Sequence, residues 1–244
     1  MTDKTPPEEL EIPPELLPRV DHLVTKNRYP VDNIFSAKQQ RLLVEPLYSS
    51  WGGGDARRTF IADSKVALFA SDNRPPMVPD MFLSMDVTLP AEIHLKENQA
   101  YYFWMFPKAP ELVIEIVSNL QQDVLDKKLY EYLRMRIIYY VLFDPEKPPE
   151  AGQVRLFVME PMKYREREEL RFPPLGLGLT LWQGEYETLE AVWLRWCDMD
   201  GNLIPTGDER ARQSEARLAA AEAETARLQA ELEQLRGPAA DSAV

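Results

Sequence analysis

The sequence predicts an α/β fold of the mixed α+β kind, with a central mixed β-sheet flanked by helices and a coiled-coil-like helix at the C-terminal end. Residues 112–117 and 138–143 form two apolar runs, of the length typical of strands that are covered on both faces. Leucines and tyrosines between them recur at helical spacing. After residue 205 the composition changes to Ala, Glu, Arg and Leu with a seven-residue period.

Composition limits the class of protein. The chain has 244 residues, which suits one medium-sized domain with tails, and no apolar run approaches the roughly 20 residues that span a bilayer. We therefore expect no membrane association. A single cysteine, Cys197, suits a reducing compartment, and we expect a cytoplasmic protein. The net charge of −12 argues against a protein that coats nucleic acid without sequence preference, because such binding depends on many lysines and arginines.

The chain divides into four parts. Residues 1–20 are rich in proline and glutamate and are expected to form a disordered leader, followed by a folded domain over residues 21–205. Residues 206–236 are expected to form a helical tail, and residues 237–244 a disordered end. Within the domain, Ser36 is predicted to cap a helix that runs to Leu43 and ends near Pro46. The glycine-rich residues 51–55 indicate a loop.

Further strands are expected before and after the two apolar runs. Residues 59–70 and 81–89 are predicted as strands joined by a turn, with Asp80 at the start of the second. The aromatic residues 101–106 are typical of a strand that packs on the core. Residues 153–160 and 162–167 are predicted as two more strands, and residues 172–205 are expected to wrap the edge of the sheet.

The carboxylate of Glu115 is the most informative side chain, because it interrupts an otherwise apolar strand. A carboxylate buried there needs a cation, a metal or a proton. On the helix that follows, Leu125, Leu129, Tyr132 and Leu133 form the core-facing stripe, and Lys128 lies at its edge. A lysine at that edge can reach back to the preceding strand, so Lys128 is the predicted partner of Glu115.

The C-terminal tail begins with a predicted capping box, in which Thr206 and Glu209 stand three residues apart. One heptad position then holds Ala211, Leu218, Thr225 and Leu232, and the other holds Ser214, Ala221, Leu228 and Leu235. The pattern predicts a helix able to pair as a coiled coil, with weak positions at Ser, Thr and Ala. A lone charged helix is the alternative. If the helix pairs, we expect a homo-oligomer, most simply a dimer.

Asp80, Glu115 and Lys128 together suggest metal-assisted phosphodiester hydrolysis. Two carboxylates can hold a hard cation such as Mg²⁺ or Mn²⁺ through oxygen. The cation would activate water and neutralise charge on the phosphate, while a lysine orients that water or stabilises the transition state. The alternative is that Glu115 and Lys128 form only a buried structural ion pair.

Four motifs give the chain a resemblance to a known family. PDMFLSMDV, PELVIEIVSN, KKLYEY and IYYVLFDP occur in this order, and the chain resembles the Uma-two family over about residues 36–205. That family belongs to the PD-(D/E)XK nuclease superfamily, so the resemblance implies a restriction-endonuclease-like core and an endonuclease that hydrolyses DNA with Mg²⁺ or Mn²⁺. It implies Asp80 and Glu115 as metal ligands and catalytic residues, with Lys128 as the catalytic lysine four residues before Tyr132.

The chain departs from the superfamily at one place and from the Uma-two pattern at two others. Val117 stands where the superfamily places its lysine, and Lys128 from the next helix takes that role in the Uma-two pattern. Arg136 and Ile137 replace a usual Gly-Val, and the first helix offers Gln39 and Gln40 where many relatives have glutamate. A different function is therefore kept open: a non-catalytic interaction or scaffold protein that assembles through its helical tail.

Overall fold

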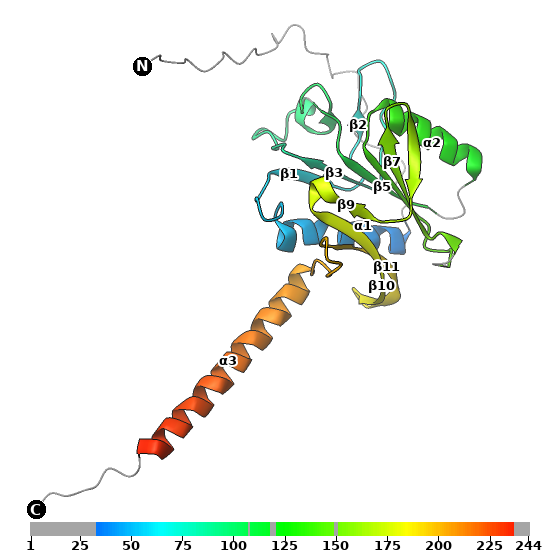
Figure 1. Cartoon of the computed structure of the whole chain (residues 1–244). Helices are drawn as coiled ribbons and strands as arrows, with labels where there is room; N and C mark the ends of the chain where they lie inside the picture. Colours follow the sequence, from blue (N-terminus) through cyan, green and yellow to red (C-terminus); the bar gives the residue numbers. More distant parts are fainter. Residues whose placement is uncertain (1–32, 107, 118–120, 149–150, 237–244) are drawn as a thin grey trace, which may run out of the picture.

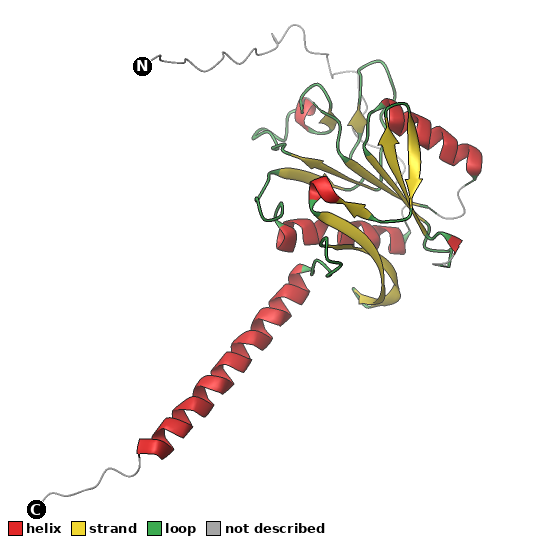
Figure 2. Ribbon diagram, viewed as in Figure 1, coloured by secondary structure: helices red, strands yellow, loops and turns green. Residues whose placement is uncertain are grey.

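The structure is a computed structural model that describes residues 33–106, 108–117, 121–148 and 151–236. Figures 1 and 2 show a sheet-based domain from which one long helix projects. The leader predicted over residues 1–20 and the end predicted over 237–244 lie outside the described residues.

The domain is built on a mixed six-stranded sheet, as the sequence predicts. Its order is β1-β3-β5-β6-β7-β8, and only β5 and β6 run parallel. A parallel pair needs a crossover connection, which α2 (Gln122–Arg134) supplies here. The strands are β1 (Phe60–Asp63), β3 (Met81–Met85), β5 (Leu112–Ile116), β6 (Tyr139–Phe143), β7 (Val154–Glu160) and β8 (Lys163–Arg167).

The two faces of this sheet are covered differently. One face packs with α1 (Ile34–Pro46) and with β9 (Arg171–Phe172), β10 (Leu177–Tyr186) and β11 (Leu189–Cys197). The other packs with α2, through Leu125 and Tyr132, and with the connection that holds β2 (Leu68–Phe69) and β4 (Tyr101–Tyr102). Because residues alternate between faces along a strand, burial on both sides explains the continuous apolar runs.

The first helix differs from its predicted start. Asn33, not Ser36, is the N-cap, because its Oδ1 accepts the backbone N–H of Ser36 at 2.8 Å. The helix continues through a π-helical turn, η2 (Leu47–Trp51), and is followed by glycines with positive φ. The loop predicted at 51–55 therefore starts at Gly52, one residue later than predicted. A Cβ on Gly53 would meet the carbonyl oxygen of Arg58 at 2.1 Å, which explains the glycine there.

Three strand predictions are too long. Residues 59–70 are broken by a turn at Lys65, whose φ is +57°, into β1 and β2. β3 ends at Met85 because Asp86 has φ +55°. Only Tyr101 and Tyr102 of the aromatic run are in a strand, where β4 pairs in parallel with β2. Tyr101 and Phe106 nevertheless stack in the core, with ring centroids 4.4 Å apart, as expected for a core segment.

Residues 172–205 do not wrap the edge of the main sheet, and that prediction is wrong. They form an antiparallel sheet in which β10 pairs with both β9 and β11, with the 3-10 turn η5 (Pro173–Leu175) between β9 and β10. This sheet packs face to face on the core and is tied to α1. The Trp196 indole donates to the Leu43 carbonyl at 2.7 Å, and the Gln39 amide bonds both backbone groups of Leu194.

The C-terminal helix α3 (Gly207–Arg236) begins with the predicted capping box. The Thr206 N–H donates to Glu209, and the Glu209 N–H donates to the Thr206 hydroxyl. Glu209 also accepts two hydrogen bonds from the guanidinium of Arg195, which is buried on β11. In the part of the chain that the structure describes, no helix has the length and apolar character needed to cross a membrane.

A further short 3-10 helix, η3 (Lys96–Asn98), lies in the connection before β4.

Candidate active site

Asp80 and Glu115 lie opposite each other on neighbouring strands. In the antiparallel register of β3 and β5, Met81 faces Ile114, so the next position toward the start of β3 sets Asp80 against Glu115. Directly opposed residues share a face of the sheet, with Cβ atoms about 5 Å apart. Both side chains are buried, at 4% and 5% exposure. Asp80 directly precedes β3, and the pairing of β3 with β5 brings it beside Glu115.

Asp80 is held from three directions. Its Oδ2 accepts the backbone N–H of Ile116 at 2.7 Å, which fixes the carboxylate beside β5. Its Oδ1 accepts the Gln40 side-chain amide of α1 at 3.1 Å and forms an ion pair with Lys65. Lys65 lies in the turn between β1 and β2, and its backbone N–H donates to the Pro79 carbonyl at 3.3 Å. The turn thus places a cation next to Asp80.

Glu115 is held by α2. Its Oε1 accepts the Tyr132 hydroxyl at 2.6 Å, and its Oε2 forms an ion pair with Lys128 at 2.9 Å. Residues four apart lie on the same side of a helix, which is why Lys128 and Tyr132 reach one carboxylate together. The Lys128 side chain is 25% exposed, so it lies between Glu115 and solvent. The predicted Glu115–Lys128 pair is present.

The surroundings of Glu115 raise its pKa above the ordinary value for a glutamate. Burial raises the pKa of Glu115, and the nearby Asp80 charge raises it further, while Lys128 and Tyr132 oppose the increase. Burial and the Glu115 charge raise the pKa of Tyr132 well above its ordinary value, so Tyr132 stays a hydrogen-bond donor. A perturbed carboxylate with a defined cationic partner is typical of functional sites, although structural ion pairs can produce it too.

Two side chains at the site carry no clear signal in the sequence. Lys65 was not predicted, because its contact depends on a turn with a positive φ inside a segment that resembles one long strand. Gln40 stands out in the sequence only as a departure from glutamate in the first helix, and its side-chain amide donates directly to Asp80. Gln39 points elsewhere, to β11. Val117 packs against the apolar face and supplies no charge.

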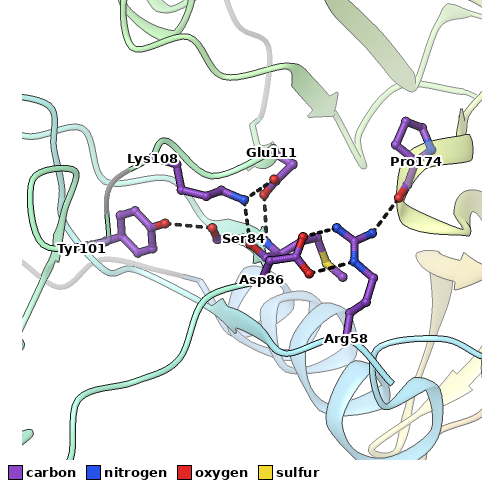
Figure 3. A network of polar contacts seen from close by, with 8 residues as sticks. Arg58, Ser84, Asp86, Tyr101, Lys108, Glu111 and Pro174 are labelled. Atoms are coloured by element: carbon purple, nitrogen blue, oxygen red, sulfur yellow. Dashed lines mark hydrogen bonds and ion pairs between the residues drawn. The ribbon is translucent and has the colours of Figure 1, made fainter. Parts of the chain in front are cut away.

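A second polar cluster lies at the opposite end of β3 and serves as a contrast (Figure 3). Lys108 pairs with Glu111, whose other oxygen accepts the Met85 N–H at 2.9 Å. Arg58 forms a two-pronged ion pair with Asp86 and donates to the Pro174 carbonyl. Figure 3 shows these groups bridging strand ends and loops. The cluster has one cation for each carboxylate and ties β1, β3 and β5 together at that end.

The donor set of Asp80 and Glu115 fits a hard divalent cation. Among the described residues no group of three or more His, Cys, Asp or Glu is arranged to hold a metal. Mg²⁺, however, is commonly bound through one or two carboxylates, with waters and substrate phosphates completing its shell. Two buried carboxylates facing each other meet that requirement, and Lys65 and Lys128 are the cations that now balance them.

The central mixed sheet with its flanking helices is consistent with the restriction-endonuclease-like fold of nucleases. Nucleases of this class generally use divalent metal ions. Residues 29–182 match the model of the Uma2 family, described as "Putative restriction endonuclease", and the chain belongs to that family. A comparison with curated proteins gave no match.

Proposed function

We propose that the protein is a Mg²⁺-dependent endonuclease, with Mn²⁺ as an alternative ion, that hydrolyses phosphodiester bonds of DNA. The observation that carries the proposal is the meeting of Asp80, Glu115 and Lys128 at one buried position of the sheet. The nuclease family supports the same reaction class. The lone buried Cys197 supports a reducing, cytoplasmic setting.

Asp80 and Glu115 are the residues that would hold the ion. When bound, the ion lowers the pKa of water and stabilises negative charge at a phosphodiester. The Tyr132 hydroxyl donates to Oε1 of Glu115, so that Oε2 faces the Lys128 ammonium group. The partly exposed Lys128 ammonium can then orient an attacking water or stabilise charge in the transition state. Lys65, 41% exposed, lies on the Asp80 side, where it can contact a phosphate.

The test is cleavage of supercoiled plasmid DNA in Mg²⁺ or Mn²⁺. Glu115→Gln and Asp80→Asn should lower the rate by about 10²-fold or more, because each removes a charge that is needed in the transition state. Glu111→Gln is the matched control, since Glu111 lies just before β5 at the opposite end of the strand and should leave the rate unchanged. Equal rates for Glu115→Gln and the wild type would refute the proposed role.

A non-catalytic scaffold protein is the second candidate, and one feature of the site favours it. Each carboxylate oxygen of Asp80 and Glu115 already has a partner within the chain. A site satisfied in this way can serve as a structural ion-pair network. Under this alternative, neither Mg²⁺ nor Mn²⁺ changes the melting temperature, and the helical tail carries the function.

A further inference from the structure

Helix α3 presents an apolar stripe that the rest of the described chain does not cover. Figure 1 shows the helix extending away from the domain, and the described side chains from Arg210 to Gln234 are exposed. At about 1.5 Å per residue, its 30 residues span roughly 45 Å. Leu218, Leu228 and Leu232 are 61%, 47% and 55% exposed and belong to the two heptad positions. Such a stripe is what a second helix covers in a coiled coil.

The polar residues on this stripe are compatible with burial. The Ser214 hydroxyl donates to the Arg210 carbonyl at 2.9 Å, and the Thr225 hydroxyl donates to the Ala221 carbonyl at 2.8 Å. Each hydroxyl is therefore satisfied by its own helix, one turn back. Covering the stripe would leave neither donor without a partner, which removes the main cost of placing Ser and Thr there.

The charges beside the stripe indicate which partner it takes. Arg217 has no acidic residue three or four positions away in the helix, and Glu222 has no basic one. Arg227, by contrast, pairs within the helix with Glu224 and Glu231. With Leu218 at heptad position a and Ala221 at position d, Arg217 occupies position g and Glu222, five residues later, occupies position e. These are the two positions that meet across a parallel pair of identical helices.

The same rule applies one heptad earlier, where Arg210 would meet Glu215 of the second copy. An antiparallel pair with full overlap sets Leu218 against Leu228 instead. It would then bring Glu222 against Glu222, and Glu224 against Glu224, across the interface, with Arg217 against Glu231 as the favourable contact. The parallel pair has no like charges at these flanking positions, so the charge pattern selects the parallel arrangement.

We propose that α3 pairs with α3 of a second copy of this chain as a parallel, in-register, two-stranded coiled coil. The first turn of α3 is fixed to the domain, because Glu209 pairs with the buried Arg195 and the Gly207 N–H donates to Glu45 at 2.9 Å. A parallel pair therefore holds two folded domains at the same end of one stalk. The proposal does not depend on the nuclease reaction.

Disulfide trapping in the full-length protein tests the orientation. The Leu218→Cys substitution places two cysteines face to face only in a parallel, in-register pair. The native Cys197 is buried, so the wild-type protein gives the background level of cross-linking. Oxidised Leu218→Cys should run as a covalent dimer on a non-reducing gel, and Leu228→Cys should do the same. A covalent product that forms only when Leu218→Cys is mixed with Leu228→Cys would show an antiparallel pair and overturn the proposal. A monomeric mass by light scattering with no cross-link would overturn it as well.

A charge swap provides the second arm of the test. Arg217→Glu should raise the dimer dissociation constant about tenfold, because it turns two attractive pairs into repulsive ones. Adding Glu222→Arg in the same chain restores both pairs and should restore the affinity. Arg227→Gln is the control, since Arg227 pairs only within its own helix among the described residues; it adds no like charge beside Glu224 or Glu231 and should change the dissociation constant much less than Arg217→Glu does. Failure of Glu222→Arg to rescue Arg217→Glu would contradict the parallel register.

Discussion

At the scale of single residues, Glu115 and its neighbours decide how the site behaves. A carboxylate 5% exposed on a central strand is unfavourable unless charge and hydrogen bonds compensate it. Lys128 supplies the charge, and Tyr132 supplies the hydrogen bond. The same carboxylate can be compensated by a divalent cation, so the present partners and a metal ion are alternatives at one position.

Lys128→Met tests this exchange. Without metal the variant should lose about 2 kcal/mol of unfolding free energy, less than for a fully buried pair because Lys128 is partly exposed. Mg²⁺ should restore much of the loss, since the ion replaces the missing charge. Lys108→Met removes a comparable pair at the far end of β3 and should not be rescued. Thermal melts with and without Mg²⁺ measure both effects. A Lys128→Met protein that gains nothing from Mg²⁺ would contradict the metal site.

The raised pKa of Glu115 predicts a pH dependence of stability. Because the folded state holds this proton more tightly, the stabilising contribution is complete below the usual value of 4.5 and is lost as pH rises through the folded pKa. Glu115→Gln lacks this titration. Its unfolding free energy relative to the wild type should therefore improve as pH rises above 4.5. Urea unfolding between pH 4 and 8 measures the difference, and a difference independent of pH would show that Glu115 is not perturbed.

Periodicity in the sequence predicts two members of this site and misses two others. Glu115 and Lys128 can be predicted because strand and helix periodicities place them on facing surfaces. Lys65 and Gln40 could not be placed in the same way. Their contacts with Asp80 depend on a left-handed turn and on how α1 packs across the sheet, and neither follows from local periodicity.

At the scale of secondary structure, the end of α2 contains a strained residue. Arg136 has φ +60°, and the Ile137 N–H donates to the Tyr132 carbonyl at 3.1 Å, so Arg136 occupies the left-handed position that ends the helix. The resemblance to the Uma-two family implies glycine there. The sequence predicts β6, β7 and β8 almost to the residue. The β10–β11 hairpin was missed because its tertiary packing, rather than a clear local pattern, defines it.

Arg136→Gly should raise the unfolding free energy by about 1 kcal/mol, because glycine adopts a positive φ without a steric penalty. Lys127→Gly, at an exposed position inside α2, is the control and should lower it by about the same amount. Chemical denaturation measures both. Destabilisation by Arg136→Gly would mean that the arginine side chain contributes more than the strain costs.

At the scale of the whole molecule, the first turn of α3 contacts the folded domain. The sequence pattern places Thr206 and Glu209 in the tail, whereas in the structure Thr206 is buried and Glu209 pairs with Arg195, which is 2% exposed. We propose that the first turn of α3 belongs to the folding unit. The rest of α3 does not contribute to the core.

Two truncations test this boundary. Ending the chain after Pro205 leaves the Arg195 guanidinium buried without its carboxylate and should cost about 3 kcal/mol. Ending it after Arg212 keeps the pair and should leave the melting temperature close to that of the full chain. Both truncations remove the coiled-coil stripe and should reduce the mass measured by light scattering. Equal stability of the two truncations would contradict the proposed boundary.

The most direct test of the central claim is a calorimetric titration of Mn²⁺ or Mg²⁺ into the full-length protein and into Glu115→Gln. If Asp80 and Glu115 form a metal site, the wild type should bind the ion, and Glu115→Gln should lose that binding while staying folded, because glutamine keeps the volume of glutamate. Glu111→Gln, at the far end of β5, should bind as the wild type does. If the wild type binds neither ion, or if Glu115→Gln binds the ion as tightly as the wild type, Asp80 and Glu115 do not form a metal site.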